Sequence, residues 1–266
     1  MSFDDAYDAL LSRWGVPVDQ LSINGTHVNA CGPLDGRPVV LLAGHGATSP
    51  VWFAVAPRLA EHHRVYAIDL LGDAGRSTGR PPRSTNDLLT WLTAVLDGLE
   101  VDRPHLVGHS YGAWLALTYA LAHPDRVDRL SLLDPTDCFT GLRPAYVARA
   151  LPSLLRPSRR RTLSFLRWET QDLPVDAQWL ELAALAAEQP RSPVARPRRP
   201  GDDALRHLRP PLLVITAGHT KTHNPERLTR RVTTLIPTAT VVPIEAATHH
   251  SLPALHAAEV LKALSH

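Results

Sequence analysis

The segment GHSYG at residues 108–112 constrains the fold of this chain more than any other feature. It follows a short apolar run and precedes a helix-like stretch. A serine between two glycines, where a strand turns into a helix, is the pattern called a nucleophile elbow. We expect side chains at Gly108 and Gly112 to collide with neighbouring backbone, and Ser110 to adopt strained dihedral angles that expose its hydroxyl. The alternative interpretation is a serine that only caps a helix.

A second glycine-rich turn lies upstream of the elbow. The apolar run 39–43 indicates a buried strand, and it leads directly into Gly44, His45, Gly46 and Ala47. Backbone N–H groups of two such turns can together bind a developing oxyanion, and we expect the donors to be the amides of Ala47 and Tyr111. The alternative is a turn that only joins a strand to a helix.

Short apolar strands alternate with helical windows along most of the chain. We expect strands at 21–24, 26–30, 39–43, 65–70, 105–109, 130–133, 212–216 and 240–244. Helical windows lie at 51–59, 85–99, 113–122, 225–235 and 254–264. The alternation predicts an α/β fold with a mostly parallel eight-stranded sheet and helices on both of its faces.

With these elements in place, the chain resembles the α/β-hydrolase superfamily over nearly its whole length. The resemblance rests on LLAGHGATSPVW (41–52), AIDLLGDAGRS (67–77), LVGHSYGAWLAL (106–117), HPDRVDRLSLLDP (123–135) and the late His249. It implies a serine hydrolase with a helical cap. It says much less about the substrate, because this superfamily hosts many chemistries.

One stretch interrupts the alternation. Residues 136–209 contain no convincing strand, but they contain helical windows at 144–155, 160–170 and 177–188, followed by a segment rich in proline and arginine. The resemblance implies that this stretch is a helical cap inserted after the sixth strand. We therefore expect one hydrolase core formed by residues 1–135 and 210–266, with residues 136–209 as its cap; 266 residues suit this arrangement.

Composition narrows the possible partners. A net charge of +2 argues against nucleic acid, and no window approaches the ~18 uninterrupted apolar residues that membrane insertion needs. The N-terminal region lacks the features of a secretory signal, so we expect a cytoplasmic protein. Cys31 and Cys138 are too few for a disulfide framework, and no zinc pattern is recognisable. We predict no metal or cofactor and a small-molecule acyl substrate, and the oligomeric state stays open.

A serine nucleophile needs a base, and that base is normally held in one tautomer by an acid. The segment EAATHHSLP looks like the superfamily's late histidine loop. Its small-residue lead-in selects His249 as the base, whereas counting back from Pro253 selects His250. We favour His249.

The acid is where the chain departs from the superfamily pattern. A carboxylate is usually expected shortly after the seventh strand, but that position falls on Thr220 or Lys221. Asp134, directly after the sixth strand, is our first candidate, although an Asp before a proline often stabilises its own turn. The alternatives are Asn224, as a neutral acceptor, and Glu169, reaching down from the cap.

Further residues are candidates for contact with the substrate. His45, Gly46 and His109 flank the two turns, and we expect them to shape the turns and border the site. The aromatic residues Trp114, Phe139 and Trp168 could line an apolar pocket, or they could pack the core and the cap instead.

These residues favour a serine hydrolase that acts on a carboxylic ester, lactone or thioester through a Ser110 acyl-enzyme. The unusual acid leaves open a non-hydrolytic enzyme of the same fold, such as a cyclase, lyase or acyl transferase. A catalytically silent binding protein is the third possibility, and the intact GHSYG segment counts against it.

Overall fold

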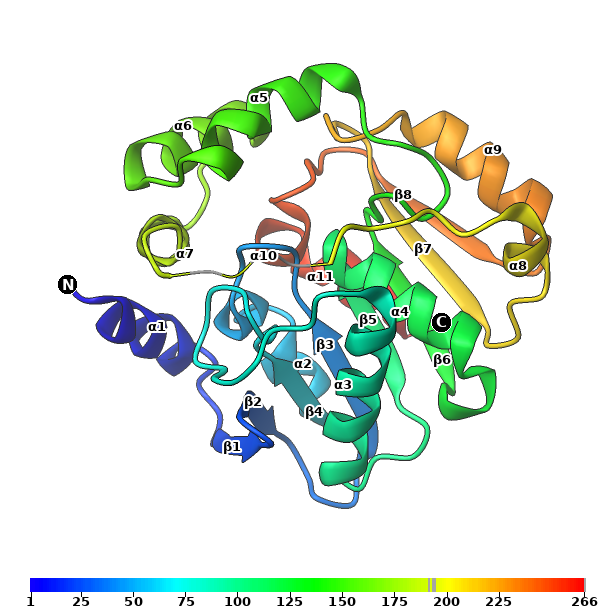
Figure 1. Ribbon diagram of the computed structural model, residues 1–266, viewed down its shortest axis with the longest axis horizontal. Coiled ribbons are helices and arrows are strands. Elements are labelled where there is room, and N and C mark those ends of the chain that lie inside the picture. Colours follow the sequence, from blue (N-terminus) through cyan, green and yellow to red (C-terminus); the bar gives the residue numbers. More distant parts are fainter. Residues whose placement is uncertain (191, 193–194, 266) are drawn as a thin grey trace.

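The structure is a computed structural model that describes residues 1–190, 192 and 195–265. Residues 191, 193 and 194 of the predicted cap and residue 266 of the predicted core lie outside these ranges. Within the described residues, eight strands form one sheet (Figure 1). They are β1 (Asp19–Ile23), β2 (Thr26–Cys31), β3 (Arg37–Leu42), β4 (His63–Ile68), β5 (His105–His109), β6 (Arg129–Leu133), β7 (Leu212–Ala217) and β8 (Thr240–Ile244).

The order of the strands is β1-β2-β4-β3-β5-β6-β7-β8. β1 pairs with β2 and β2 with β4 in antiparallel fashion, and every later pair is parallel. Parallel strands covered on both faces are expected to be apolar along their whole length, and all six residues of β7 are buried. The predicted mostly parallel eight-stranded sheet is confirmed.

Helices cover both faces of the sheet. Successive side chains of a strand point to opposite faces, so each strand contributes to both cores. Val40 and Leu42 of β3 face a core formed with α3 (Thr85–Gly98), α4 (Tyr111–Ala122), α8 (Asp202–Arg206) and α9 (Pro225–Leu235). Val39 and Leu41 face the opposite core, formed with α1 (Phe3–Ser12), α2 (Ala56–Leu59), α10 (Leu252–Leu255) and α11 (Ala257–Leu264).

Helix α1 is an element that the sequence analysis did not anticipate. Ser2 and Asp5 form a reciprocal capping box at its start, a signal that was present in the sequence. The helix buries Tyr7, whose hydroxyl donates to the buried carboxylate of Asp69 after β4 at 2.9 Å. α1 also packs against the helix α7 (Ala177–Ala186).

Two predicted helices are broken in the structure. In place of the window 51–59, the structure has the 3₁₀ turn η1 (Ser49–Trp52) and the single helical turn α2. Pro57 has no backbone N–H, so it cannot donate the hydrogen bond that a continuous helix would need at this position. The window 254–264 is divided at His256 into α10 and α11. A short 3₁₀ turn, η2 (Pro124–Arg126), joins α4 to β6.

In the described part of the chain, α8 and three longer helices lie between β6 and β7. The three longer helices are α5 (Pro144–Leu155), α6 (Arg159–Glu169) and α7. α6 contacts both α5 and α7, and Figure 1 shows this group lying apart from the helices α3 and α4 that cover the sheet. The three helical windows predicted between the sixth and seventh strands are therefore present. Among the described residues, no helix combines the length and apolar character needed to cross a bilayer.

The elbow after β5 has the predicted steric constraints. A Cβ atom at Gly108 would lie 2.4 Å from the carbonyl oxygen of Gly112, and one at Gly112 would lie 2.1 Å from that of Leu42. Ser110 adopts φ 55° and ψ −116°, a conformation that costs about 1–3 kcal/mol and persists only where the surroundings enforce it. The tight approach of α4 to β3 is thus what sets the direction of the Ser110 side chain.

Because backbone atoms cannot move aside cheaply, we expect Gly112→Ala to lower the free energy of unfolding by about 2–3 kcal/mol or more. Gly201→Ala is the matched control, since a Cβ atom there meets nothing within 4 Å. Urea unfolding of both variants measures the difference. Equal stabilities would contradict the steric account of the elbow.

Candidate active site

Ser110 lies between the end of β5 and the first turn of α4. Its backbone N–H donates to Leu133 O at 3.1 Å, which ties the elbow to the neighbouring strand β6. The amide of Tyr111 begins α4, where helix N–H groups have no carbonyl of their own helix to bond. The side chain of Ser110 therefore stands beside a cluster of backbone donors.

His249 connects Ser110 to a carboxylate. The Ser110 hydroxyl donates to His249 Nε2 at 2.8 Å, and His249 Nδ1–H donates to Asp134 Oδ2 at 2.6 Å. Burial lowers the pKa of His249, and Asp134 opposes this only in part. A neutral imidazole with its hydrogen on Nδ1 presents a lone pair to the serine, as a general base requires.

Asp134 is fully buried at the carboxyl end of β6 and accepts hydrogen bonds from the adjacent strand. Ala217 N–H donates to Oδ1 at 3.2 Å, and Thr220 Oγ1 donates to Oδ2 at 2.7 Å. Burial alone would raise the pKa of Asp134, but His223 and His249 hold it well below its usual range. The carboxylate is therefore negatively charged and fixed in direction. It bonds outward to β7 and the histidine loop rather than only to its own turn.

The neighbourhood of Asp134 includes a residue that the sequence analysis did not assign. His223 Nε2 lies 3.3 Å from Asp134 Oδ1, and the His223 side chain is buried. Its Nδ1 lies 2.8 Å from Thr222 Oγ1. No local pattern marked this histidine, because its contact with Asp134 joins two strand ends that are far apart in the chain.

The two alternative acids have other partners. Asn224 caps α9, and its Oδ1 accepts from the amide of Arg227 at 2.7 Å, so the prediction that it could orient the histidine is wrong. Glu169 does reach the histidine loop, but it accepts from the backbone N–H of His249 at 3.0 Å rather than from the imidazole. The proposal that Glu169 orients the His249 ring is corrected accordingly.

Glu169 instead holds the loop as a whole. Its Oε2 accepts from His250 N–H at 3.0 Å, from His250 Nδ1 at 3.0 Å and from Thr248 Oγ1 at 3.3 Å. Burial would raise the pKa of Glu169, but hydrogen bonds from the side chain and backbone of His250 lower it to about 2. His250 faces Glu169 and not Ser110, which disfavours the alternative that His250 is the base.

The glycine-rich turn after β3 is held by a buried carboxylate from the loop after β4. Asp73 Oδ2 accepts from Gly46 N–H at 2.6 Å and lies 2.7 Å from His45 Nδ1. Ala47 N–H donates to Gly44 O at 3.1 Å. This contact closes the turn, and the role of Ala47 as an oxyanion donor stays a prediction.

Ser110 opens into a cavity of about 890 Å³ between the sheet and the helices α5, α6 and α7. His45, Gly46 and Tyr111 line it together with apolar side chains of all three helices, which include Leu154, Leu166 and Leu182. A cavity of this size and lining suits a largely apolar small molecule.

Four of the predicted substrate contacts do not line this cavity. His109 is buried, and its Nε2–H donates to His249 O at 2.9 Å, so it supports the histidine loop. Trp114 and Phe139 are fully buried in the core. Trp168 packs beneath Lys221 Nζ, which lies 4.4 Å from its ring centre. Other aromatic side chains line the cavity instead, among them Tyr146, Phe165 and Trp179.

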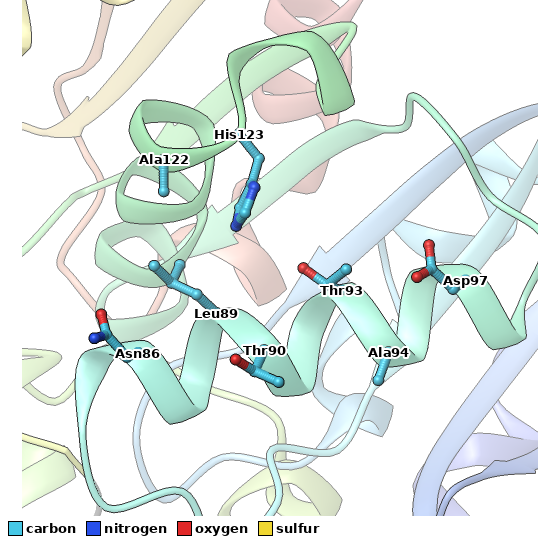
Figure 2. A pocket seen from close by; sticks show the side chains of 8 residues that line it. All are labelled: Asn86, Leu89, Thr90, Thr93, Ala94, Asp97, Ala122 and His123. Atoms are coloured by element: carbon cyan, nitrogen blue, oxygen red, sulfur yellow. The ribbon is translucent and has the colours of Figure 1, made fainter.

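Figure 2 shows a second hollow, which is lined by side chains of α3 and of the C-terminal end of α4. It has a volume of about 640 Å³, and its lining includes Thr90, Asp97 and His123. At about 1.5 Å per residue, α4 separates Ala122 at this hollow from Ser110 by roughly 18 Å. This hollow is therefore not part of the arrangement around Ser110.

The sequence of this chain is similar to those of known hydrolases. A model of the alpha/beta hydrolase family matches residues 39–263. The chain is 28% identical over 246 residues to an uncharacterized carboxylesterase, nap, of Bacillus subtilis, covering 87% of this chain and 80% of that protein. It is 25% identical over 252 residues to carboxylesterase YbfK of the same organism, covering 89% and 83%.

Two solved structures match nearly the whole of this chain. The structure of naproxen esterase (carboxylesterase NP) from Bacillus subtilis matches with a TM-score of 0.91 and 25% identity, covering 99% of this chain and 95% of that chain. The structure of carboxylesterase CesB (YbfK) from Bacillus subtilis has the same fold, with a TM-score of 0.92 at 23% identity, and covers the same shares of the two chains.

The contacts of Glu169 predict how stability depends on pH. A carboxyl whose pKa is lowered by folding stabilises the protein above its unfolded value of 4.5, and this contribution is lost as pH falls toward about 2. Its full size is on the order of 3 kcal/mol. We expect Glu169→Gln to be much less stable than the wild type at pH 7, with a gap that narrows steadily between about pH 5 and pH 3.

Urea unfolding across this pH range measures the gap. Glu245→Gln is the control, because Glu245 is exposed and its replacement should leave the pH dependence unchanged. A gap between Glu169→Gln and the wild type that is constant with pH would show that Glu169 is not held as a buried carboxylate.

Proposed function

This chain belongs to the alpha/beta hydrolase family, and from that premise we propose that it hydrolyses carboxylic esters through an acyl-enzyme formed on Ser110. The continuous chain of hydrogen bonds from Ser110 through His249 to Asp134, at the wall of a large cavity, carries the proposal. The similarity to two carboxylesterases over more than four fifths of this chain supports the same reaction.

In the proposed reaction, Ser110 Oγ attacks the ester carbonyl carbon while its proton passes to His249 Nε2. Collapse of the tetrahedral intermediate breaks the bond to the alcohol oxygen, which takes the proton back from the imidazolium. A water molecule then gives a proton to His249 and attacks the acyl carbon. The bond from the acyl carbon to Ser110 Oγ breaks, the imidazolium returns the proton to Oγ, and the carboxylic acid leaves. Asp134 keeps the hydrogen of the imidazole on Nδ1 and stabilises its positive charge in both steps.

The oxyanion is proposed to bind at the start of α4. The amide of Tyr111 lies next to Ser110 and at the positive end of the helix, so it favours negative charge on the carbonyl oxygen. A donor of this kind contributes about 2.7–4 kcal/mol to transition-state stabilisation. The turn after β3 lies beside the nucleophile, since a Cβ atom at Gly44 would be 3.1 Å from Ser110 Cβ.

The unusual position of the acid no longer favours non-hydrolytic chemistry. That alternative rested on Thr220 and Lys221 standing where a carboxylate is expected. Thr220 instead donates its hydroxyl to Asp134, which supplies the missing charge from the neighbouring strand end. We propose small-molecule esters as the substrates, and the apolar lining of the cavity supports an apolar acyl or alcohol group.

If Ser110 is the nucleophile, a fluorophosphonate probe should label the wild-type protein at one site, and intact mass should show no label on Ser110→Ala. The same variant should hydrolyse p-nitrophenyl butyrate at least about 10³-fold more slowly, because only the residual stabilisation by the oxyanion site remains. Labelling of both forms would place the nucleophile elsewhere.

The position of the acid can be tested by moving it. We expect Asp134→Ser to lower kcat by about 10³- to 10⁴-fold, because the imidazole loses its orienting partner. Adding Thr220→Glu to this variant should raise kcat at least about tenfold. Thr220 Oγ1 lies only 2.7 Å from the Asp134 carboxylate, so a glutamate at position 220 can take the place of that carboxylate.

The control for this series is Asn224→Ala. Asn224 caps α9, so its replacement should reduce stability by about 1 kcal/mol and leave kcat unchanged. If Asp134→Ser kept full activity in a folded protein, Asp134 would not be the acid.

A further inference from the structure

A second pair of histidine and carboxylate lies beside the proposed catalytic pair. His250 Nδ1 lies 3.0 Å from Glu169 Oε2, and the rings of His249 and His250 are 4.8 Å apart. Glu169 ends helix α6, and its side chain is fully buried. Neighbouring residues on one loop are therefore held by two different carboxylates, one from the sheet and one from the helices above it.

The contacts of Glu169 fix the tautomer of His250. An ionised carboxylate can only accept hydrogen bonds, so the Nδ1 that faces it must carry the hydrogen. In a neutral imidazole, Nε2 then carries a lone pair and acts as an acceptor. The His250 ring is also fixed in direction, because it packs edge-on against Phe165 at 5.8 Å and against His249.

Nε2 is the polar atom of His250 that is left to the cavity. His250 lines the cavity with Ser110, and its side chain is 22% exposed. Among the described residues, no hydrogen bond to this atom is present. Phe165 and Leu166, which also line the cavity, offer it no polar partner. An acceptor held in a mostly apolar wall selects a ligand that brings its own donor.

We propose that His250 and Glu169 form a specificity site that accepts a hydrogen bond from a hydroxyl group of the substrate, close to the ester bond. The site favours hydroxy esters over esters in which a methyl group replaces the hydroxyl. His250 acts on recognition of the substrate and takes no proton from Ser110. The inference rests on the proposed ester hydrolysis at Ser110.

Two pairs of nearly isosteric esters locate the recognised hydroxyl. Methyl 3-hydroxybutyrate against methyl 3-methylbutyrate tests the acyl side, and 2-hydroxyethyl butyrate against propyl butyrate tests the alcohol side. All assays are run at one pH, about pH 8, so that the members of each pair are compared under the same conditions. We expect kcat/KM of the wild type to favour the hydroxy ester at least about tenfold in one of the two pairs.

Two variants assign this preference to His250. His250→Phe keeps the ring and removes both nitrogens, whereas His250→Asn keeps an N–H donor for Glu169 and removes Nε2. Both should lose the preference through a higher KM for the hydroxy ester, so that kcat/KM falls at least about tenfold further for the hydroxy ester than for its methyl counterpart. Thermal unfolding checks that each variant is folded, and failure of one to fold leaves the other to decide.

The possible failures are distinguishable. Equal hydrolysis of both members of each pair by the wild type would overturn the specificity site and leave the proposed function intact. An equal loss for both members in the variants would show that His250 supports the structure of the loop only. If no ester is hydrolysed in a Ser110-dependent way, the proposed function and this inference both fail.

Discussion

The buried carboxylate of Asp134 joins the parts of this molecule that would otherwise be independent. It stands at the end of β6, accepts hydrogen bonds from the backbone and a threonine after β7, and lies 2.6 Å from the imidazole of His249. A charge at zero exposure is tolerated only when it is paired and hydrogen-bonded on several sides. The same contacts that make burial possible also fix the direction of the proposed base.

Glu169 has the corresponding role for the helices above the sheet. It is buried at the end of α6 and bonds three consecutive residues of the histidine loop, 248–250. Lys221 Nζ donates to the carbonyl oxygen of Trp168, which ties the same end of α6 to the loop after β7. The position of α6 and the conformation of the histidine loop are therefore coupled, and a movement of one disturbs the other.

Much of the site could be predicted from short sequence segments. The glycines at 108 and 112 restrict the backbone locally, and the structure gives Ser110 the strained φ of 55° that they imply. The residues that line the cavity could not be predicted in the same way. Trp114 and Phe139 have the right chemistry for a pocket, but both are buried at 0% exposure, because the direction of a helical side chain depends on what packs against it.

The sequence by itself determined the order of the strands, the sharp turn at Ser110 and the resemblance to one fold family, since apolar periodicity and glycine sterics act over a few residues. Only the tertiary structure decided which acid faces the histidine, because Asp134 and His249 are 115 positions apart and follow β6 and β8, two strands that have β7 between them. It also decided that Thr220 supports this acid, that Asn224 caps a helix, and that Glu169 holds the loop backbone. Each of these contacts depends on how distant segments pack, which local patterns do not encode.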